Sequence, residues 1–240
     1  MGTYDVRLER RDEIATGTMA FQFEKPAGFV FEPGQAIDVV LIEPPATDSS
    51  SERHTFSIVS APFEAELVVA TRMRDSAFKR ALKSLPIGAP ARIEGPFGSF
   101  TLRRDPARPA VFIAGGIGIT PFMSILRQAA QEGSPRRLAL IYSNRRPEDA
   151  AFLAELQQLE ERNRNFRLFA TMTQMDKSAR PWSGETSLVD AELLQRCVGE
   201  LAAAVYYVVG PPAMVEAMRQ TLGHAGIAEE DIRSEEFYGY

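Results

Sequence analysis

The sequence predicts two domains of different architecture, an antiparallel β barrel or sandwich in residues 1–105 and a parallel α/β sheet in residues 106–240. Before residue 105, short apolar stretches alternate with turn residues, which is typical of antiparallel strands. After it, apolar runs of the buried-strand type alternate with helical patterns, which indicates parallel strands joined by right-handed crossovers. Between them, the segment LRRDPARPA has two prolines and three arginines and is predicted to be the linker.

The composition limits the classes of function. The chain has 240 residues, of which 45% are hydrophobic, so it can bury a sizeable core. A net charge of -5 disfavours a general nucleic-acid binder. The single cysteine forms no internal disulfide and no cysteine-ligated iron–sulfur cluster, and the two histidines are too few for a usual metal site, so we expect no metal. No apolar run reaches the roughly 20 residues of a membrane span, and the first residues lack the apolar core of a signal peptide, so a cytoplasmic location is expected.

The elements of the first domain follow from its apolar pattern. A helix is expected at Ser76–Ser84, where Phe78 and Leu82 are four residues apart and fall on one face. Six strands are expected, at residues 4–14, 16–26, 36–45, 55–60, 65–73 and 91–100.

The second domain shows strands and helices in alternation. Its strands are expected at residues 111–116, 138–143, 166–173 and 205–210. Helices are expected at residues 120–133, 147–163 and 212–226, where apolar residues recur at helical spacing; Pro147 suits a first helical turn, and Gly226 ends the last helix. The final segment, DIRSEEFYGY, reads as a strand that ends in an aromatic tail.

A glycine-rich turn follows the first strand of the second domain. In VFIAGGIGITPFMSIL, a buried strand leads into Gly115, Gly116 and Gly118, and a helix begins near Pro121. Glycines allow a phosphate to approach the main chain, and the helix amino terminus, with Thr120 as its cap, favours a pyrophosphate. The spacing differs from G-x-G-x-x-G, so a tight turn without a ligand is the alternative interpretation.

Four motifs, taken in order along the chain, resemble those of the ferredoxin–NADP reductase superfamily. HTFSIVSAP resembles the flavin motif, GPFGSF resembles the turn that closes the flavin barrel, and GGIGITP and VGPPAM resemble the two nucleotide motifs. This resemblance implies an FAD-binding antiparallel β barrel in residues 1–105 and an NAD(P)-binding α/β domain in residues 106–240. It implies FAD and NADPH, or NADH, as cofactors.

The sequence departs from the family pattern at two places. His54 stands where the flavin motif R-x-Y-S has its arginine, as in the H-P-F-T form of the ferric reductase and NADPH oxidase branch, and Arg53 is expected to supply charge from the next position. Val209 stands where a cysteine often lies beside the nicotinamide, so we expect slower hydride transfer.

The resemblance implies a set of flavin contacts. Phe56 is expected to stack on the isoalloxazine and Ser57 to bond its N5 edge, while the helix that begins near Ser76 points its amides at the pyrophosphate. Lysines farther along this helix, Lys79 and Lys83, are expected to face solvent, in a basic patch that suits an acidic carrier. The expected FAD contacts are Arg53, His54, Thr55, Phe56, Ser57, Arg72, Ser76, Ala77 and Phe78.

The dinucleotide contacts are expected on the glycine-rich turn and on the loops after two other strands. Arg145 is expected to pair with a 2′-phosphate, which would select NADPH; an ordinary surface arginine is the alternative. The expected contacts are Gly115, Gly116, Gly118, Thr120, Pro121, Ser143, Asn144, Arg145, Gly210, Pro211 and Met214.

The aromatic tail is expected to cover the flavin face that the nicotinamide must reach. Phe237 is the first candidate for this cover and Tyr240 the second, and Glu235 or Glu236 is expected near N5; a loosely held tail is the alternative. The residues expected to act in catalysis are Ser57, Glu236 and Phe237.

These observations predict an enzyme that passes electrons from NADPH, or NADH, through FAD to a separate one-electron acceptor, either a ferredoxin or a haem protein. A flavin or ferric reductase is one alternative. A non-catalytic electron-transfer subunit of a larger oxidoreductase is another, and the absence of an added cysteine cluster counts against it.

Overall fold

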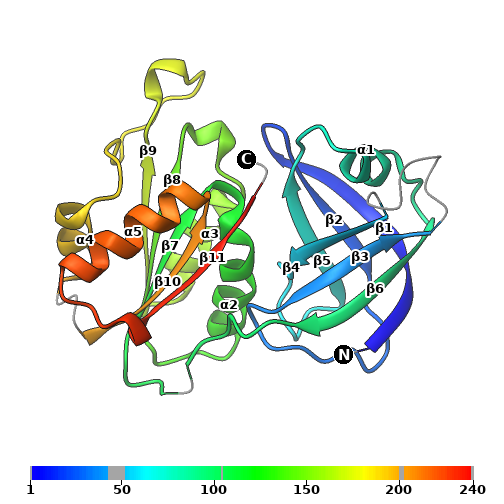
Figure 1. Ribbon diagram of the computed structural model, residues 1–240, viewed down its shortest axis with the longest axis horizontal. Coiled ribbons are helices and arrows are strands. Elements are labelled where there is room, and N and C mark those ends of the chain that lie inside the picture. Colours follow the sequence, from blue (N-terminus) through cyan, green and yellow to red (C-terminus); the bar gives the residue numbers. More distant parts are fainter. Residues whose placement is uncertain (1, 43–51, 104, 200–202, 239–240) are drawn as a thin grey trace. The chain divides into compact units, whose positions relative to one another are not determined.

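The computed structural model describes residues 2–42, 52–103, 105–199 and 203–238. The chain folds into two compact units. The first unit contains residues 1–101 and 120–128, and the second contains residues 102–119 and 129–240. Figure 1 shows the elements of both units.

Six antiparallel strands form the first unit, in the order β4-β3-β6-β1-β2-β5. The sheet closes on itself because Ile58, just after β4, bridges Val69 of β5, and the Val59 amide donates to the Val68 carbonyl at 2.8 Å. The predicted barrel is therefore found, and the sandwich alternative is wrong. The strands are β1 (Gly2–Ala15), β2 (Thr18–Glu24), β3 (Ala36–Leu41), β4 (Arg53–Ser57), β5 (Glu66–Arg72) and β6 (Pro90–Phe97).

The barrel core follows from alternation along the strands. In β3, Ile37, Val39 and Leu41 are buried while the residues between them are half-buried, as expected when one face of a sheet covers a core. The helix α1 (Ala77–Ser84) adds Phe78 and Leu82 to the same core, which confirms the helix predicted from their spacing.

The second unit contains a parallel sheet in the order β11-β10-β7-β8-β9. Every residue of its central strands β7 and β10 is buried, as is typical of parallel strands covered on both faces. The strands are β7 (Ala110–Gly115), β8 (Leu138–Asn144), β9 (Phe166–Met172), β10 (Val205–Gly210) and β11 (Ile232–Glu236).

Helices α2 (Thr120–Gln131) and α5 (Pro212–His224) lie where the sequence predicts them. The helix predicted at residues 147–163 is wrong in its first part: a 3₁₀ turn at Pro147–Asp149 precedes α3 (Leu153–Arg162), and Phe152 between them has a φ of 60°. The turn is closed because Arg146 donates to both carboxylate oxygens of Asp149, each at 2.8 Å.

One helix was not predicted. In α4 (Ala191–Val198), Asp190 is the N-cap and its Oδ1 accepts a hydrogen bond from the Leu193 amide at 2.8 Å. The signal was present, since a capping aspartate precedes apolar residues at helical spacing. No helix of the described residues is long and apolar enough to cross a membrane.

Candidate functional site

The strand β4 and the start of α1 bring three aromatic rings together in the first unit. The His54 ring stacks on Phe56 with centroids 4.6 Å apart, and it lies 5.4 Å from the Phe78 ring. Phe56 is only 5% exposed, so its ring belongs to the barrel core and His54 presents the outer aromatic surface. Ser57, the next residue of β4, is also buried.

Arg53 and Thr55 project from the other face of β4, because successive residues of a strand alternate. Arg53 forms ion pairs with Asp38 at 3.0 Å and Glu94 at 2.8 Å. The Thr55 hydroxyl donates to Asp38 Oδ1 at 2.5 Å. Among the residues expected to hold FAD, these two are therefore separated from the His54 ring, and the charge of Arg53 is already paired.

His54 is best described as a neutral histidine with one defined tautomer. Desolvation against the neighbouring rings lowers the pKa of His54 below its ordinary value, and the positive charge of Lys79 acts in the same direction. Its Nδ1 lies 2.8 Å from the Thr55 carbonyl oxygen, which can only accept, so Nδ1 carries the proton. Nε2 is left as a hydrogen-bond acceptor.

The amino terminus of α1 lies close to these rings. Ser76 caps the helix, since its Oγ accepts from the Lys79 amide at 3.2 Å, and the first-turn amides of Ala77 and Phe78 have no partner within the helix. Lys79 donates from Nζ to the Arg72 carbonyl at 2.9 Å. The prediction that Lys79 faces solvent is wrong: it is 8% exposed, and burial lowers the pKa of its ammonium. The sequence did not reveal the burial of Lys79, because helical spacing alone does not show whether the aliphatic part of a lysine side chain lies against the core.

The second group of predicted residues lies at the carboxyl edge of the parallel sheet. The chain passes from β7 outwards to β8 and β9 and then returns to β10 on the other side of β7. A crevice is expected outside the carboxyl ends of β7 and β10, because the connections leave these strands in opposite directions. Gly115 ends β7 and Gly210 ends β10, so both predicted nucleotide motifs flank this point.

Close packing explains two of the glycines of this edge. A Cβ on Gly115 would lie 2.4 Å from the Met214 sulfur, and a Cβ on Gly118 would lie 2.4 Å from the Val209 carbonyl oxygen. The loops after β7 and β10 therefore fit together only without side chains there. Glycine is favoured at position 116 for a different reason, because its φ of 53° lies in the left-handed region.

The loop continues directly into a helix. Residues Gly116–Ile119 form a 3₁₀ turn, and α2 begins at Thr120 with Pro121 as its next residue. Thr120 is 1% exposed. On the β10 side, Pro211 precedes α5, and Met214 lies in its first turn.

The end of β8 supplies the third part of this edge. Ser143 pairs in register with Gly115, and Asn144 follows it. Asn144 is 6% exposed, and neither its Nδ2 nor its Oδ1 has a partner in the described part of the chain. A buried amide that lacks a partner costs about 1–3 kcal/mol, so this side chain fits a site that is completed by a ligand or by water.

Arg145 and Arg146 differ sharply in what they contact. Arg145 is exposed, and no described residue forms an ion pair or side-chain hydrogen bond with its guanidinium. Arg146 is held by Asp149 at 2.8 Å and by Glu148 at 3.6 Å. The sequence showed no acid at the end of the strand, but these two acids follow in the turn and occupy Arg146.

The carboxyl-terminal segment lies beside the same edge. Glu236 pairs with Gly210, and the Phe237 amide donates to the Gly210 carbonyl at 2.9 Å. Glu236 is exposed and accepts a hydrogen bond from the Tyr238 hydroxyl. Burial raises the pKa of the Glu235 carboxyl above its ordinary value. Tyr240, the second candidate for the aromatic cover, lies outside the described residues.

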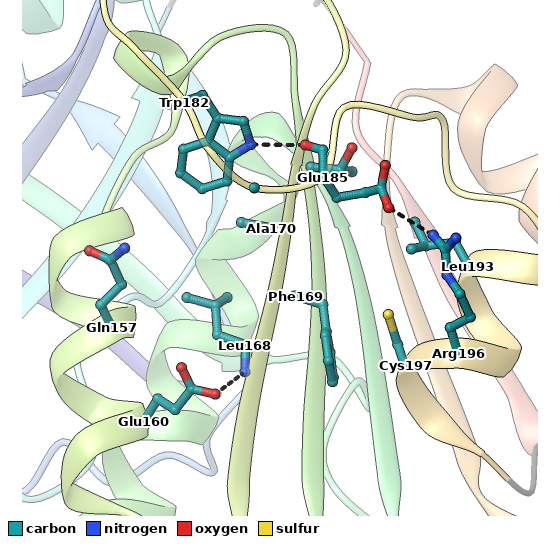
Figure 2. Close-up of a pocket in the computed structure, with 12 residues that line it drawn as sticks. Gln157, Glu160, Leu168, Phe169, Ala170, Trp182, Glu185, Leu193, Arg196 and Cys197 are labelled. Atoms are coloured by element: carbon teal, nitrogen blue, oxygen red, sulfur yellow. Dashed lines mark hydrogen bonds and ion pairs between the residues drawn. The ribbon is translucent and has the colours of Figure 1, made fainter.

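A separate pocket of about 460 Å³ borders the edge strand β9, and none of the predicted site residues lines it (Figure 2). Several polar groups that line this pocket already have partners within the protein. Arg196 pairs with Glu185 at 2.7 Å, and Trp182 Nε1 donates to the Glu185 carbonyl at 2.8 Å. Glu160 accepts a hydrogen bond from the Leu168 amide at 3.0 Å. Burial raises the pKa of the Cys197 thiol, so it is a poor nucleophile. The described residues contain no group of three potential ligands for a metal ion.

Part of the chain matches a protein-family model. Residues 112–220 match the family model described as the oxidoreductase NAD-binding domain. This range includes most of β7, the glycine-rich turn, β8 and the loop after β10.

Several curated proteins are similar over nearly the whole chain. The glycine betaine monooxygenase reductase subunit of Chromohalobacter salexigens is 26% identical over 98% of this chain and 61% of its own length. The propane 2-monooxygenase reductase component of Rhodococcus jostii is 29% identical over 89% of this chain and 57% of its length. Ferredoxin–NADP reductase B of Sorangium cellulosum is 29% identical over 98% of this chain and 97% of its length. The chain thus spans about three fifths of the first two relatives and almost all of the third.

A solved structure shares the fold. The ferredoxin NADP⁺ reductase from Neisseria gonorrhoeae, a structure with bound FAD and NADP, aligns with a TM-score of 0.81 over 98% of each chain. The sequence identity is 21%, so this likeness shows the fold alone.

Proposed function

We propose, from the premise that the chain belongs to the ferredoxin–NADP reductase superfamily, that it is a flavoenzyme that passes electrons from NADPH, or NADH, through FAD to a separate acceptor. The observation that carries this proposal is the placement of two glycine motifs, after β7 and after β10, at the switch point of the parallel sheet. Residues 1–105 are proposed as the FAD-binding domain and residues 106–240 as the nucleotide domain.

The barrel residues fit a flavin. Bound FAD would supply the conversion of a two-electron hydride donor into single-electron steps. The α1 amino terminus, with Arg72 and Ser76–Phe78 around it, fits a pyrophosphate because its amides and partial positive charge point outwards. Neutral His54 presents Nε2 as an acceptor, so it fits a ribitol hydroxyl better than a phosphate. Ser57 is proposed for the flavin edge.

Two of the expected flavin contacts take a supporting part in this proposal. Arg53 and Thr55 hold Asp38 on the face of β4 opposite to the His54 ring, and so fix the strand that carries His54 and Ser57. Phe56 supports the His54 ring from the core at 4.6 Å. We therefore propose His54, and not Phe56, as the ring of this strand that contacts the cofactor.

The carboxyl edge of the parallel sheet fits a dinucleotide. Gly116, with its left-handed backbone, and Thr120 and Pro121 at the start of α2 are proposed around the pyrophosphate, and Gly210, Pro211 and Met214 around the nicotinamide side. Ser143 and Asn144 are proposed beside the adenosine, where the unpartnered amide of Asn144 can be satisfied.

NADPH is the proposed electron donor. Arg145 is exposed and unpaired among the described residues, so its guanidinium is available to a 2′-phosphate. Phe237, tied to Gly210, is proposed to cover the flavin face before the nicotinamide arrives, with Glu236 next to it. These roles extend the proposal to individual residues.

The acceptor is proposed to be a separate protein that carries an iron–sulfur or haem centre, and the enzyme is proposed to act in the cytoplasm. Two of the relatives are named as reductase components of monooxygenases, and a third as a ferredoxin–NADP reductase, which favours this class of acceptor over free flavin or ferric chelate.

Reconstitution tests the proposal. The purified chain is mixed with FAD, freed of excess flavin by gel filtration and examined by absorption spectroscopy. We expect retained yellow flavin that NADPH bleaches anaerobically, followed by turnover with ferredoxin or cytochrome c. A chain that retains no FAD would contradict the flavoenzyme function, whereas bleaching with turnover only on free FMN would favour a flavin reductase.

A further inference from the structure

A second pocket, of about 370 Å³, lies at the amino-terminal edge of the parallel sheet, where β7, β8 and β9 begin. Its apolar lining residues include Val111, Ala139 and Val198. Three arginines line it, and none of the described lining residues is acidic. The arginines, which we call the basic triad, are Arg137, Arg164 and Arg167.

The register of the sheet brings two arginines of the basic triad to one face. Arg137 precedes β8, and Ala139 lies two residues later, so their side chains share a face. Ala139 pairs with Arg167 of β9, and residues paired in a parallel sheet also share a face. Arg137 and Arg167 therefore project in the same direction, on the face of the sheet that carries Val111 and Ala139.

The backbone that carries the basic triad is held by hydrogen bonds. The Arg137 carbonyl accepts from the Ala110 amide at 3.0 Å, and the Asn165 carbonyl accepts from the Leu138 amide at 2.8 Å. Asn165 Nδ2 donates to the Ser134 carbonyl at 3.0 Å, which ties the turn of Arg164 to the segment before Arg137. These hydrogen bonds fix the backbone from which the three arginine side chains project, which reduces the entropy lost when the chain closes on a ligand.

Among the described residues, no acidic side chain pairs with the basic triad. Arg167 donates to the Phe166 carbonyl at 2.8 Å, and in the described ranges Arg137 and Arg164 have no acidic partner. Three like charges at one pocket repel each other, and an anion removes this repulsion. Guanidinium groups bind phosphate and carboxylate oxygens in bidentate fashion, so oxyanions fit best.

We propose that this pocket binds a small oxyanion ligand with two or more negative charges and a compact apolar part, either a phosphate ester or a dicarboxylate. A concave site lined by both arginines and apolar residues favours a small molecule over the flat surface of an acidic protein. The proposal is independent of the proposed function, because the pocket lies at the amino-terminal edge and the glycine motifs lie at the carboxyl edge of the same sheet.

A titration followed by ¹H–¹⁵N TROSY spectra tests the proposal, because it separates the two edges of the sheet. Sodium pyrophosphate and sodium succinate serve as the probes, at constant ionic strength. With at least one probe we expect saturable shifts at the amides of Arg137, Arg164 and Arg167. The two probes distinguish a phosphate ligand from a dicarboxylate.

Two variants complete the experiment. In Arg137→Ala/Arg164→Ala, affinity at this pocket should fall by about tenfold or more, as expected when charged hydrogen bonds are lost. Arg162→Ala removes a nearby exposed arginine that does not line the pocket and should leave affinity unchanged. The unchanged spectrum of each variant elsewhere shows that it is folded.

Three outcomes would overturn the proposal. Pyrophosphate shifts confined to the amides around Gly116 would show binding only at the nucleotide edge. An equal loss of affinity in Arg162→Ala would show non-specific attraction. Shifts produced by polyglutamate and by neither small probe would indicate a protein surface in place of a small-molecule site.

Discussion

At the scale of single residues, the contacts of His54 determine both its protonation state and its tautomer. Its pKa is lowered by desolvation against Phe56 and Phe78, and Nδ1 donates to the Thr55 carbonyl. Because the chain has only two histidines, their ring nitrogens can be followed by ¹H–¹⁵N NMR, with a His224→Ala variant for assignment. We expect His54 to titrate below its ordinary value of 6.5 and to carry its neutral proton on Nδ1.

The lowered pKa has a consequence for stability. The unfolded chain binds a proton at His54 more readily than the folded chain, so stability from this group is present above pH 6.5 and is lost as the pH falls through the folded pKa. The free energy of unfolding of His54→Gln should therefore fall less on acidification than that of the wild type. A steeper fall in the variant would contradict the neutral assignment.

Two adjacent arginines provide a matched pair of variants. Arg145→Ala should weaken NADPH binding by about 10- to 100-fold, as expected for a charge-assisted contact, with little change for NADH and in Tm. Arg146→Ala should lower Tm, because it leaves the carboxylate of Asp149 without its guanidinium partner, which holds the turn before α3. Isothermal titration with both dinucleotides and thermal unfolding measure these effects. An equal loss of both dinucleotides in Arg145→Ala would exclude the 2′-phosphate contact.

Phe237 is the residue on which the proposed aromatic cover depends. A stacked aromatic ring is worth about 0.5–1.5 kcal/mol beyond its buried area, which a bound nicotinamide can replace. Phe237→Ser should therefore tighten nicotinamide binding and speed reoxidation of the reduced enzyme by oxygen, which stopped-flow absorbance measures. The matched variant Tyr238→Ser, at an exposed position, should change neither rate nor affinity. Unchanged oxygen reactivity in Phe237→Ser would assign the tail to packing.

At the scale of elements, capping determines where α4 begins. Asp190 Oδ1 accepts from the Leu193 amide at 2.8 Å, so Asp190→Ala should lower the free energy of unfolding by about 1 kcal/mol, measured by urea denaturation. Glu192 lies in the same first turn and forms only a long ion pair with Arg196, at 3.7 Å. Glu192→Ala should change stability by less than about 0.5 kcal/mol. Equal losses in both variants would show that the cap is not the cause.

At the scale of the whole molecule, ion pairs and a hydrogen bond hold the linker segment against the rest of the second unit. Arg103 and Arg108 both pair with Asp231, at 3.1 and 2.7 Å, and the Arg103 amide donates to the Tyr207 hydroxyl at 2.9 Å. Asp231 ends the 3₁₀ turn Glu229–Asp231 and immediately precedes β11. The same carboxylate thus holds both the entry of the chain into this unit and the start of the strand that leads to Phe237.

Removing that carboxylate tests the arrangement. The hydrogen bond from Arg108 lowers the pKa of Asp231, so its stabilisation is present above the unfolded pKa and is lost as the pH falls through the folded value. Asp231→Asn should lower the free energy of unfolding by about 1.5–3 kcal/mol at neutral pH, and less in acid. Glu229→Gln, in the same turn, should have little effect because the Glu229 side chain is 88% exposed. A constant difference between wild type and Asp231→Asn at all pH values would contradict the charge-based explanation.

The sequence by itself determined the two kinds of sheet, because periodicity follows directly from which faces of a strand or helix are buried. It also located the glycine turn, since Gly116 needs a left-handed backbone that few other residues adopt. It did not determine that Arg53 pairs with Asp38 and Glu94, that Lys79 is buried, or that Arg146 is occupied by Asp149.

The pairing of Arg53 and the burial of Lys79 were decided by the tertiary structure, because each depends on which part of another strand or helix lies opposite. The pairing of Arg146 with Asp149 is a local contact three residues along the chain, and it depends on the closed turn before α3. The break at Phe152 has the same origin, since the closed turn before α3 is incompatible with a continuous helix. The basic triad is the clearest case. Arg137 and Arg167 are far apart in the sequence, and only the register of β8 and β9 places them on one face of the sheet.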